Sequence, residues 1–285
     1  MNVDFRMLYE KFLDLIYPSA LYCICCGKII DASRPYRLCN ECIADIRWAD
    51  GSQDAAMRSN RIAEETRMIS SAVELDESLE IRTCQKCGKI LSRNNPMRIC
   101  YSCREYAHVF DMGFTCCEYG MNPRSMLFAL KYHGRTDIGI TIAEIMHNRM
   151  GQLRMETGLV YDAILPVPMS EEKRRQRGYN QAAVIARELA CLEETEYLGD
   201  ALQRVRNTAP LRGMAPAERR QVLAGAMEVA ESAVTVVSGK DLLLIDDIYT
   251  TGSTVDAAAE VLLAAGAERV YILTFAAGAD VIKAE

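Results

Sequence analysis

Cysteine is the most constraining feature of this 285-residue sequence, which contains twelve of them. Eight form two clusters of one pattern, a Cys-x2-Cys-Gly knuckle followed, twelve residues later, by a second Cys-x2-Cys pair. Aligned at an offset of 61, residues 23–42 and 84–103 are identical at nine of twenty positions, where unrelated sequences would share about one or two. We interpret the two clusters as an internal duplication.

The spacing predicts two metal sites. Two thiolates separated by two residues bind one tetrahedral ion from a tight turn, and the following glycine permits that turn. Four thiolates complete the shell of Zn2+, so we predict two structural zinc sites without an open position. Disulfide knuckles and an iron–sulfur centre are the alternatives. The predicted ligands are Cys23, Cys26, Cys39, Cys42, Cys84, Cys87, Cys100 and Cys103.

Four cysteines lie outside this pattern. Cys25 is within the first knuckle, where it is an alternative ligand, and the others are Cys116, Cys117 and Cys191. We expect these four to be small buried hydrophobic residues, because free cysteine is among the most buried residue types.

Composition limits the classes of function. The net charge is −6, which argues against a protein that coats nucleic acid over its whole surface. No run of eighteen apolar residues predicts a membrane span, and charged residues throughout 1–18 do not fit a signal peptide. We therefore expect a reducing, cytoplasmic location.

Hydrophobic periodicity divides the chain into an N-terminal part and an α/β part. A helical stripe over 3–16 precedes the first ribbon, and a polar helical spacer over 52–81 separates the ribbons. Predicted strands at 163–165, 241–245 and 269–276 then alternate with predicted helices at 126–132, 180–192 and 254–265, which indicates a parallel sheet flanked by helices. The predicted units are 1–46 (helix and first ribbon), 47–82 (spacer), 83–106 (second ribbon) and 107–285 (α/β domain).

Residues 242–254, LLLIDDIYTTGST, predict the ligand site. An apolar strand ends in Asp246 and Asp247, a hydroxyl-rich turn follows, and a helix begins. Ligands of open α/β sheets bind beyond the carboxyl ends of strands, and backbone N–H groups at a helix start suit a phosphate. The two carboxylates suit sugar hydroxyls or Mg2+. The alternative is a turn whose hydroxyl merely caps the helix. The predicted phosphate-binding residues are Thr250, Thr251, Gly252, Ser253 and Thr254.

This segment resembles the motif that binds phosphoribosyl pyrophosphate (PRPP) in type I phosphoribosyltransferases. The resemblance implies that the turn holds the 5′-phosphate, that the two acids reach the ribose, and that Mg2+ accompanies PRPP. The segments 129–134 (ALKYHG), 164–168 (ILPVP) and 177–181 (RGYNQ), with the N-terminal ribbon, are similar to the ComF family of competence-associated proteins, ComFC-type members in particular. That family usually has one ribbon rather than two.

A basic segment follows the predicted strand 163–165. Lys173, Arg174, Arg175 and Arg177 crowd five positions, and Lys131 precedes them in the ALKYHG segment. Guanidinium groups pair bidentately with phosphates, so these residues are candidates for binding pyrophosphate or single-stranded DNA. The alternative is a solvated charged segment.

Three functions fit these features. The ComF resemblance implies a protein that binds PRPP or a related ribose phosphate and handles single-stranded DNA, with competence proteins as partners, during DNA uptake in natural transformation. An active phosphoribosyltransferase with an unknown base or amine acceptor is the second function, although the sequence identifies no catalytic residue. A PRPP-sensing regulator without turnover is the third.

Overall fold

The computed structural model describes residues 21–31, 33–51, 81–206, 214 and 216–281. The predicted helix over 3–16 and nearly all of the predicted helical spacer lie outside the described residues.

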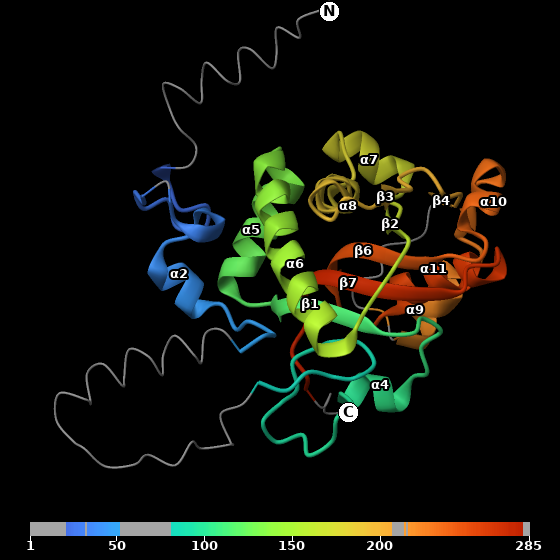
Figure 1. The fold of residues 1–285 in the computed structure, drawn as a ribbon, viewed down its shortest axis with the longest axis horizontal. Coiled ribbons are helices and arrows are strands. Elements are labelled where there is room, and N and C mark those ends of the chain that lie inside the picture. Colours follow the sequence, from blue (N-terminus) through green and yellow to red (C-terminus); the bar gives the residue numbers. More distant parts are fainter. Residues whose placement is uncertain (1–20, 32, 52–80, 207–213, 215, 282–285) are drawn as a thin grey trace, which may run out of the picture.

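A parallel sheet forms the centre of the described chain (Figure 1). Its strand order is β1-β7-β6-β2-β3, and each pair of neighbours is parallel. This arrangement confirms the α/β class that the strand–helix alternation predicts. The strands of the sheet are β1 (Gly113–Glu118), β2 (Ala163–Pro166), β3 (Glu196–Tyr197), β6 (Asp241–Tyr249) and β7 (Arg269–Ala277), and an antiparallel pair is formed by β4 (Leu202–Arg204) and β5 (Met227–Val229).

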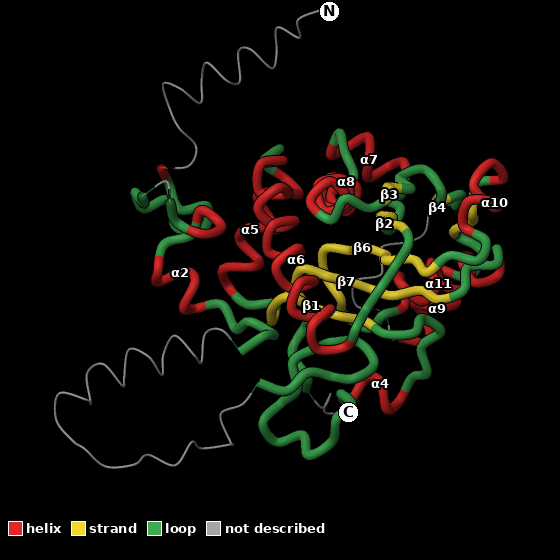
Figure 2. The backbone as a smooth tube through the Cα atoms, in the orientation of Figure 1, coloured by secondary structure: helices red, strands yellow, loops and turns green. Residues whose placement is uncertain are grey.

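Helices cover both faces of the sheet (Figure 2). Buried side chains of α5, α6 and α8 share one core with Leu243 and Ile245 of β6, whereas those of α11 share the other core with Leu242 and Leu244. Alternate residues of a strand point to opposite faces, so β6 supplies both cores. The helices are η2 (Pro35–Arg37), α2 (Asn40–Asp45), α4 (Tyr101–Glu105), α5 (Met121–Tyr132), α6 (Thr136–Thr157), α7 (Glu171–Arg177), α8 (Gln181–Leu192), α9 (Pro216–Leu223), η4 (Glu231–Ala233), α10 (Val234–Val237) and α11 (Ser253–Ala264).

Two elements extend beyond their predicted limits. Helix α5 begins at Met121 and contains Pro123 in its first turn, where the missing N–H of proline has no intrahelical partner to lose. Strand β6 continues past Ile245 to Tyr249, because β7 pairs with it as far as Ala277. The predicted limit of this strand at Ile245 was therefore too early.

The first ribbon packs against α5 and α6. Arg37 donates to Asp137 at 3.0 Å, and Asn122 donates to the carbonyl of Cys42 at 3.2 Å. The chain then runs along β1, where the N–H of Ala49 donates to the carbonyl of Cys116 at 2.9 Å. The start of the predicted spacer unit is thus paired with the sheet.

The four additional cysteines have different environments. Cys116 and Cys117 are buried in β1, as predicted, and Cys25 is partly buried with its Sγ 3.8 Å from the carbonyl oxygen of Asn122. Cys191 is exposed, contrary to the prediction. It follows the buried Leu189 by two residues on α8, which turns its side chain away from the core.

Among the described residues, no helix has the length and apolar character needed to cross a membrane.

Candidate functional site

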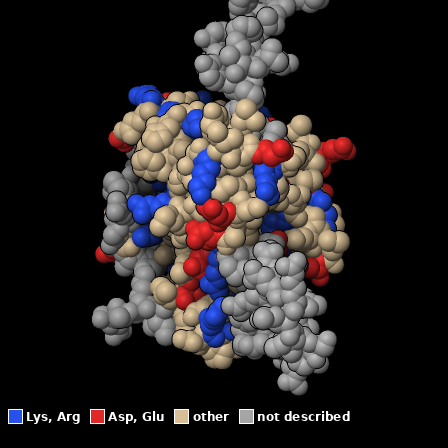
Figure 3. All heavy atoms as spheres, turned by 90° about the vertical axis from the view of Figure 1, so that its left-hand side faces the viewer, with Lys and Arg blue, Asp and Glu red and all other residues tan. Residues whose placement is uncertain are grey.

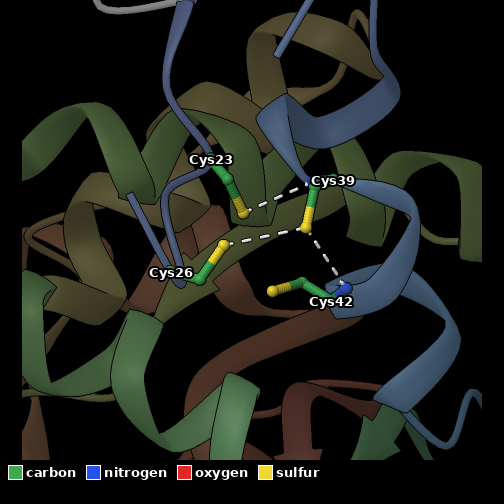
Figure 4. A group of neighbouring side chains, drawn as sticks. All are labelled: Cys23, Cys26, Cys39 and Cys42. Carbon is green, nitrogen blue, oxygen red and sulfur yellow. Dashed lines mark hydrogen bonds between the residues drawn. The ribbon is translucent and has the colours of Figure 1, made fainter. Parts of the chain in front are cut away.

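Each four-cysteine group brings its thiols to one point. The four Sγ atoms of either group lie within 4.8 Å of one another, and Figure 4 shows those of the first group converging from the knuckle and from the start of α2. Zn–S bonds of about 2.3 Å in a tetrahedron require S–S separations of about 3.8 Å. The Sγ atoms of Cys26 and Cys39, and those of Cys87 and Cys100, are 3.7 Å apart. Both groups therefore fit zinc.

The two groups also share their backbone contacts to sulfur. The N–H of Cys39 donates to the Sγ of Cys23 at 3.3 Å, and the N–H of Cys100 donates to the Sγ of Cys84 at the same distance. Such donors stabilise the thiolate, which is the form that binds metal. Cys25 does not join the group, and burial, followed by the neighbouring thiols, raises its pKa to about 12.

A glycine turn joins β6 to α11 in the predicted phosphate site. Gly252 has a φ of +82°, and a Cβ atom there would lie 2.5 Å from the hydroxyl of Tyr249. Only glycine satisfies both conditions. The Thr251 and Ser253 hydroxyl oxygens are 3.1 Å apart. Hydroxyls and the first N–H groups of α11 are thus gathered at one turn, the arrangement that binds anions at helix starts.

The two acids of β6 have different neighbours. Asp247 is buried, forms an ion pair with Lys131 of α5 and accepts a hydrogen bond from Gln181 at 3.3 Å. Asp246 accepts the N–H of Asp247 at 2.8 Å. Burial, followed by the charge of Asp247, raises the pKa of Asp246 well above the ordinary carboxyl value. Because both acids lie within the strand, their side chains point to opposite faces.

The predicted basic candidates do not form a single site. Lys131 and Arg177 line a cavity of about 340 Å3 with Lys173. Arg174 lines a separate cavity of about 720 Å3 between α7, α8 and β4. Arg175 lies on the exposed face of α7 and pairs with a glutamate of the same helix at 3.4 Å.

Cations are concentrated around the smaller cavity. Partial burial lowers the pKa of Lys173, and the charges of Arg204, Arg177 and Lys131 lower it further. Mutual repulsion of this kind is relieved when an anion binds among the cations.

Two contacts to the phosphate turn, and a histidine that bonds to residues on either side of it, were not predicted. The Nζ of Lys89 donates to the carbonyl of Thr250 at 3.3 Å, and Arg219 donates to the hydroxyl of the same threonine at 3.4 Å. The ring of His108 lies between Tyr249, at 3.2 Å, and the carboxylate of Asp256 at 2.6 Å. For Lys89 the sequence signal was that it is among the identities of the duplication, and for Arg219 that it belongs to the arginine-rich part of the chain that follows α7.

Known proteins are similar to this chain over part of its length. The family model described as "Phosphoribosyl transferase domain" matches residues 171–284. "DNA utilization protein YhgH" of Escherichia coli O157:H7 is 26% identical over 206 residues, which cover 72% of this chain and 86% of that protein. "Competence protein F" of Haemophilus influenzae is 28% identical over 196 residues, covering 66% and 82%. "Competence protein ComFC" of Bacillus subtilis is 30% identical over 103 residues, covering 36% and 39%.

The matched domain contains β6, the glycine turn and α11, which are the elements of the candidate phosphate site. The relatives carry competence or DNA utilization names, and the cysteine groups provide the ribbons that the resemblance implies. These findings support the resemblance to the ComF family that the sequence indicates.

Proposed function

We propose that this protein binds PRPP or a related ribose phosphate at the end of β6 and handles single-stranded DNA on the adjacent surface. The observation that carries the proposal is the convergence of a hydroxyl-rich glycine turn, two acids and several cations on one edge of the sheet. The phosphoribosyl transferase domain supports the first half, and the names of the relatives support the second.

The ribose phosphate is assigned to the turn and to Asp246. N–H groups and hydroxyls of Thr250–Thr254 bind the 5′-phosphate, and Asp246 accepts hydrogen bonds from ribose hydroxyls. Asp247 is already paired with Lys131, so Asp246 is the carboxylate that also suits Mg2+, directly or through water. When bound, Mg2+ neutralises charge on the pyrophosphate group, which lies in the cation-lined cavity.

Replacing Asp246 by asparagine is expected to weaken PRPP binding and to stabilise the protein. Loss of hydrogen bonds to a charged acceptor costs about 1.5–3 kcal/mol, or about 10–100-fold in affinity. The raised pKa means that stability is lost as the pH rises from the ordinary carboxyl pKa towards the folded value. At pH 8 the variant should therefore melt at a higher temperature than the wild type, and the gain should vanish near pH 4, where the carboxyl group is protonated in both states.

Isothermal titration with PRPP and Mg2+, with thermal melts at both pH values, makes this measurement. Asp31→Asn, on the exposed surface of the first ribbon, is the control and should change neither quantity by more than twofold or 1 °C, roughly the scatter of neutral surface substitutions. Unchanged PRPP affinity in Asp246→Asn would exclude this carboxylate from the site.

The single strand is assigned to a basic and aromatic surface at the junction of α5 and α7. We name it the α5–α7 surface. Phe128 and Tyr132 are 50% and 60% exposed, with ring centroids 4.8 Å apart, and Arg177 lies 5.1 Å above the Tyr132 ring. Exposed rings stack on bases, and adjacent cations follow the phosphate backbone. The surface comprises Phe128, Tyr132, His133, Lys173 and Arg177, of which Tyr132, Lys173 and Arg177 also line the cation-lined cavity.

The overall charge supports a local DNA contact of this kind. The protein is acidic, and on the face in Figure 3 Lys and Arg side chains lie among Asp and Glu side chains. The described residues therefore form no extended basic surface on that face. We expect DNA binding to depend on base stacking as well as on charge.

Two substitutions separate these contributions to DNA binding. Tyr132→Ala should weaken binding of a labelled oligonucleotide by about 1–3 kcal/mol without changing its salt dependence. Arg177→Ala should lower the slope of log affinity against log salt by about 0.7, the value for one single-strand phosphate contact. Fluorescence anisotropy across salt concentrations measures both. Arg175→Ala, from the exposed face of the same helix, is the matched control, and an equal effect there would contradict the assignment.

Phosphoribosyl transfer is a second candidate function, favoured by the cavity of about 720 Å3 beside the end of β2, which offers space for an acceptor. An acceptor nitrogen would form a bond to C1 of the ribose as the C1–O bond to pyrophosphate breaks, and the nitrogen would lose its proton to solvent. Pyrophosphate release in the presence of candidate bases or amines tests this activity. DNA affinity that changes with PRPP, without pyrophosphate release, favours the regulator instead.

A further inference from the structure

We propose that the second ribbon is part of the phosphate site, and that Lys89 positions the Thr250–Thr254 turn for phosphate. The inference rests on the proposed function, since it assumes that a ribose phosphate binds at this turn. It assigns a role to the ribbon that the family resemblance leaves unexplained. Lys89 is a positioning residue in this proposal, because its ammonium contacts the turn rather than the ligand.

Lys89 is a buried cation. Its side chain is 5% exposed, its Nζ donates to the carbonyl of Thr250 at 3.3 Å, and it lies 5.9 Å from the centroid of the Tyr249 ring. Within the described part of the chain no carboxylate pairs with it. Burying an ammonium without a carboxylate is costly. A phosphate bound at the neighbouring turn would supply the missing negative charge.

The contact also orients the backbone of the turn. In a trans peptide the C=O and the following N–H point in opposite directions. Because the carbonyl of Thr250 is held towards Lys89, the N–H of Thr251 points away from the ribbon. The second ribbon thereby fixes the direction of the first donor in the phosphate turn.

The ribbon is docked too tightly to move independently of the sheet. At Gly88, φ is +72° and a Cβ atom would lie 2.4 Å from the Cα of Phe114 in β1. The N–H of Gly113 donates to the carbonyl of Lys86 at 2.7 Å. At the opposite side of the ribbon, Asp280 accepts hydrogen bonds from the backbone of Ser92 and Tyr101 and from the Asn95 side chain.

A second anchor lies between the ribbon and α11. Burial raises the pKa of Tyr249, so its hydroxyl stays protonated and donates to Nε2 of His108. The Nδ1–H of His108 then donates to Asp256, which also accepts the N–H of Val109 at 3.2 Å. The segment that leaves the second ribbon is thus tied to the first turn of α11.

The first ribbon provides an internal comparison. Lys28 and Gly27 are the equivalents of Lys89 and Gly88 at the offset of 61. The Lys28 side chain is 57% exposed and pairs with Glu41, and a Cβ atom at Gly27 would meet nothing within 4 Å. The same short motif is therefore docked on the sheet in one copy and open to solvent in the other.

The test compares Lys89→Met with Lys28→Met in the full, zinc-loaded chain, using isothermal titration with ribose 5-phosphate and with inorganic pyrophosphate. Lys89→Met should weaken ribose 5-phosphate binding about 10–100-fold, the range for lost charged hydrogen bonds. Pyrophosphate, which is assigned to the cation-lined cavity rather than to the turn, should bind as in the wild type. Lys28→Met should leave both affinities within about twofold, since exposed ion pairs contribute little.

Stability distinguishes positioning from a structural role. Removing a buried charge without a carboxylate partner should leave the melting temperature of Lys89→Met equal to or above that of the wild type, while ribose phosphate affinity falls. Parallel losses of stability, pyrophosphate binding and ribose phosphate binding would mean that Lys89 only supports the fold. Unchanged ribose phosphate affinity would overturn the inference, whereas a wild-type protein that binds no ribose phosphate would overturn the proposed function itself.

Discussion

Replacing Cys84 by serine is expected to abolish ribose phosphate binding, whereas the same change at Cys23 should leave it within about threefold of the wild type. The two positions are equivalent in the duplication. Each cysteine is 2% exposed, and each accepts a backbone N–H at 3.3 Å. Either substitution removes one ligand and should lower the zinc content from two ions to one, so the variants differ in which ribbon is lost.

The size of the effect follows from what metal binding contributes to a small ribbon. Structural zinc supplies about 10–16 kcal/mol of apparent binding free energy in comparable peptides, which is more than a ribbon of this size gains from its own core. Loss of the second ion should therefore unfold the ribbon that holds Lys89 against Thr250. The first ribbon packs on α5 and α6, away from this turn.

Zinc content by a colorimetric chelator assay and ribose 5-phosphate titration on both variants give the result. The melting temperature should also fall further in Cys84→Ser, because Cys84, Cys87 and Leu91 share one core with Val255 of α11. Equal losses of ribose phosphate affinity in both variants would show that the ribbons contribute alike, and would contradict the special role of the second one.

The duplication also shows which features of the structure can be predicted from the sequence and which cannot. Ligand spacing predicts both thiol groups because the chemistry is local: two turns and four thiolates suffice. The position of each ribbon is not local. Lys28 and Lys89 occupy the same motif, yet the contact of Lys89 is to a residue 161 positions away. The Cys-Gly-Lys-Ile sequence that the two copies share does not distinguish the docked copy from the open one.

The two acids of β6 illustrate a second limit. Their adjacency at the end of the predicted strand suggests a pair acting together. In the structure β7 continues to pair through Asp246 and beyond, so strand alternation separates the two side chains. The partner that neutralises Asp247 is Lys131, which comes from α5, more than a hundred residues earlier. The motif predicts the strand–turn–helix element correctly, but only tertiary packing gives each acid its own neighbours.

The Asp247–Lys131 pair yields a second large expected effect. Asp247 is 5% exposed and the Lys131 side chain is 17% exposed, so removing one partner leaves the other charge poorly solvated. Breaking a buried pair costs about 3–5 kcal/mol. Asp247→Asn keeps an acceptor for Gln181 but not the charge, and Lys131→Met keeps the aliphatic stem, so each variant removes mainly the electrostatic contact.

Urea denaturation of both single variants and of the Asp247→Asn/Lys131→Met double variant measures the coupling. Each single change should destabilise the protein by about 3 kcal/mol or more, and the double variant should cost less than their sum by about 1–3 kcal/mol, because it leaves no unpaired charge. Additive losses would mean that the two side chains do not interact. As a control, the slope of unfolding free energy against urea concentration should be equal in the three variants, which would show that their unfolded states are alike.

In the same two variants, the change in pyrophosphate affinity should not follow the change in stability. Asp247→Asn releases the Lys131 ammonium from its carboxylate at the edge of the cation-lined cavity, so pyrophosphate affinity should rise about 3–10-fold, or about 0.7–1.4 kcal/mol. Lys131→Met should lower that affinity by a similar factor. A site in which Lys131 serves only to neutralise Asp247 would show no gain in Asp247→Asn. The direction of the affinity change in Asp247→Asn therefore decides whether Lys131 binds pyrophosphate as well as stabilising the fold.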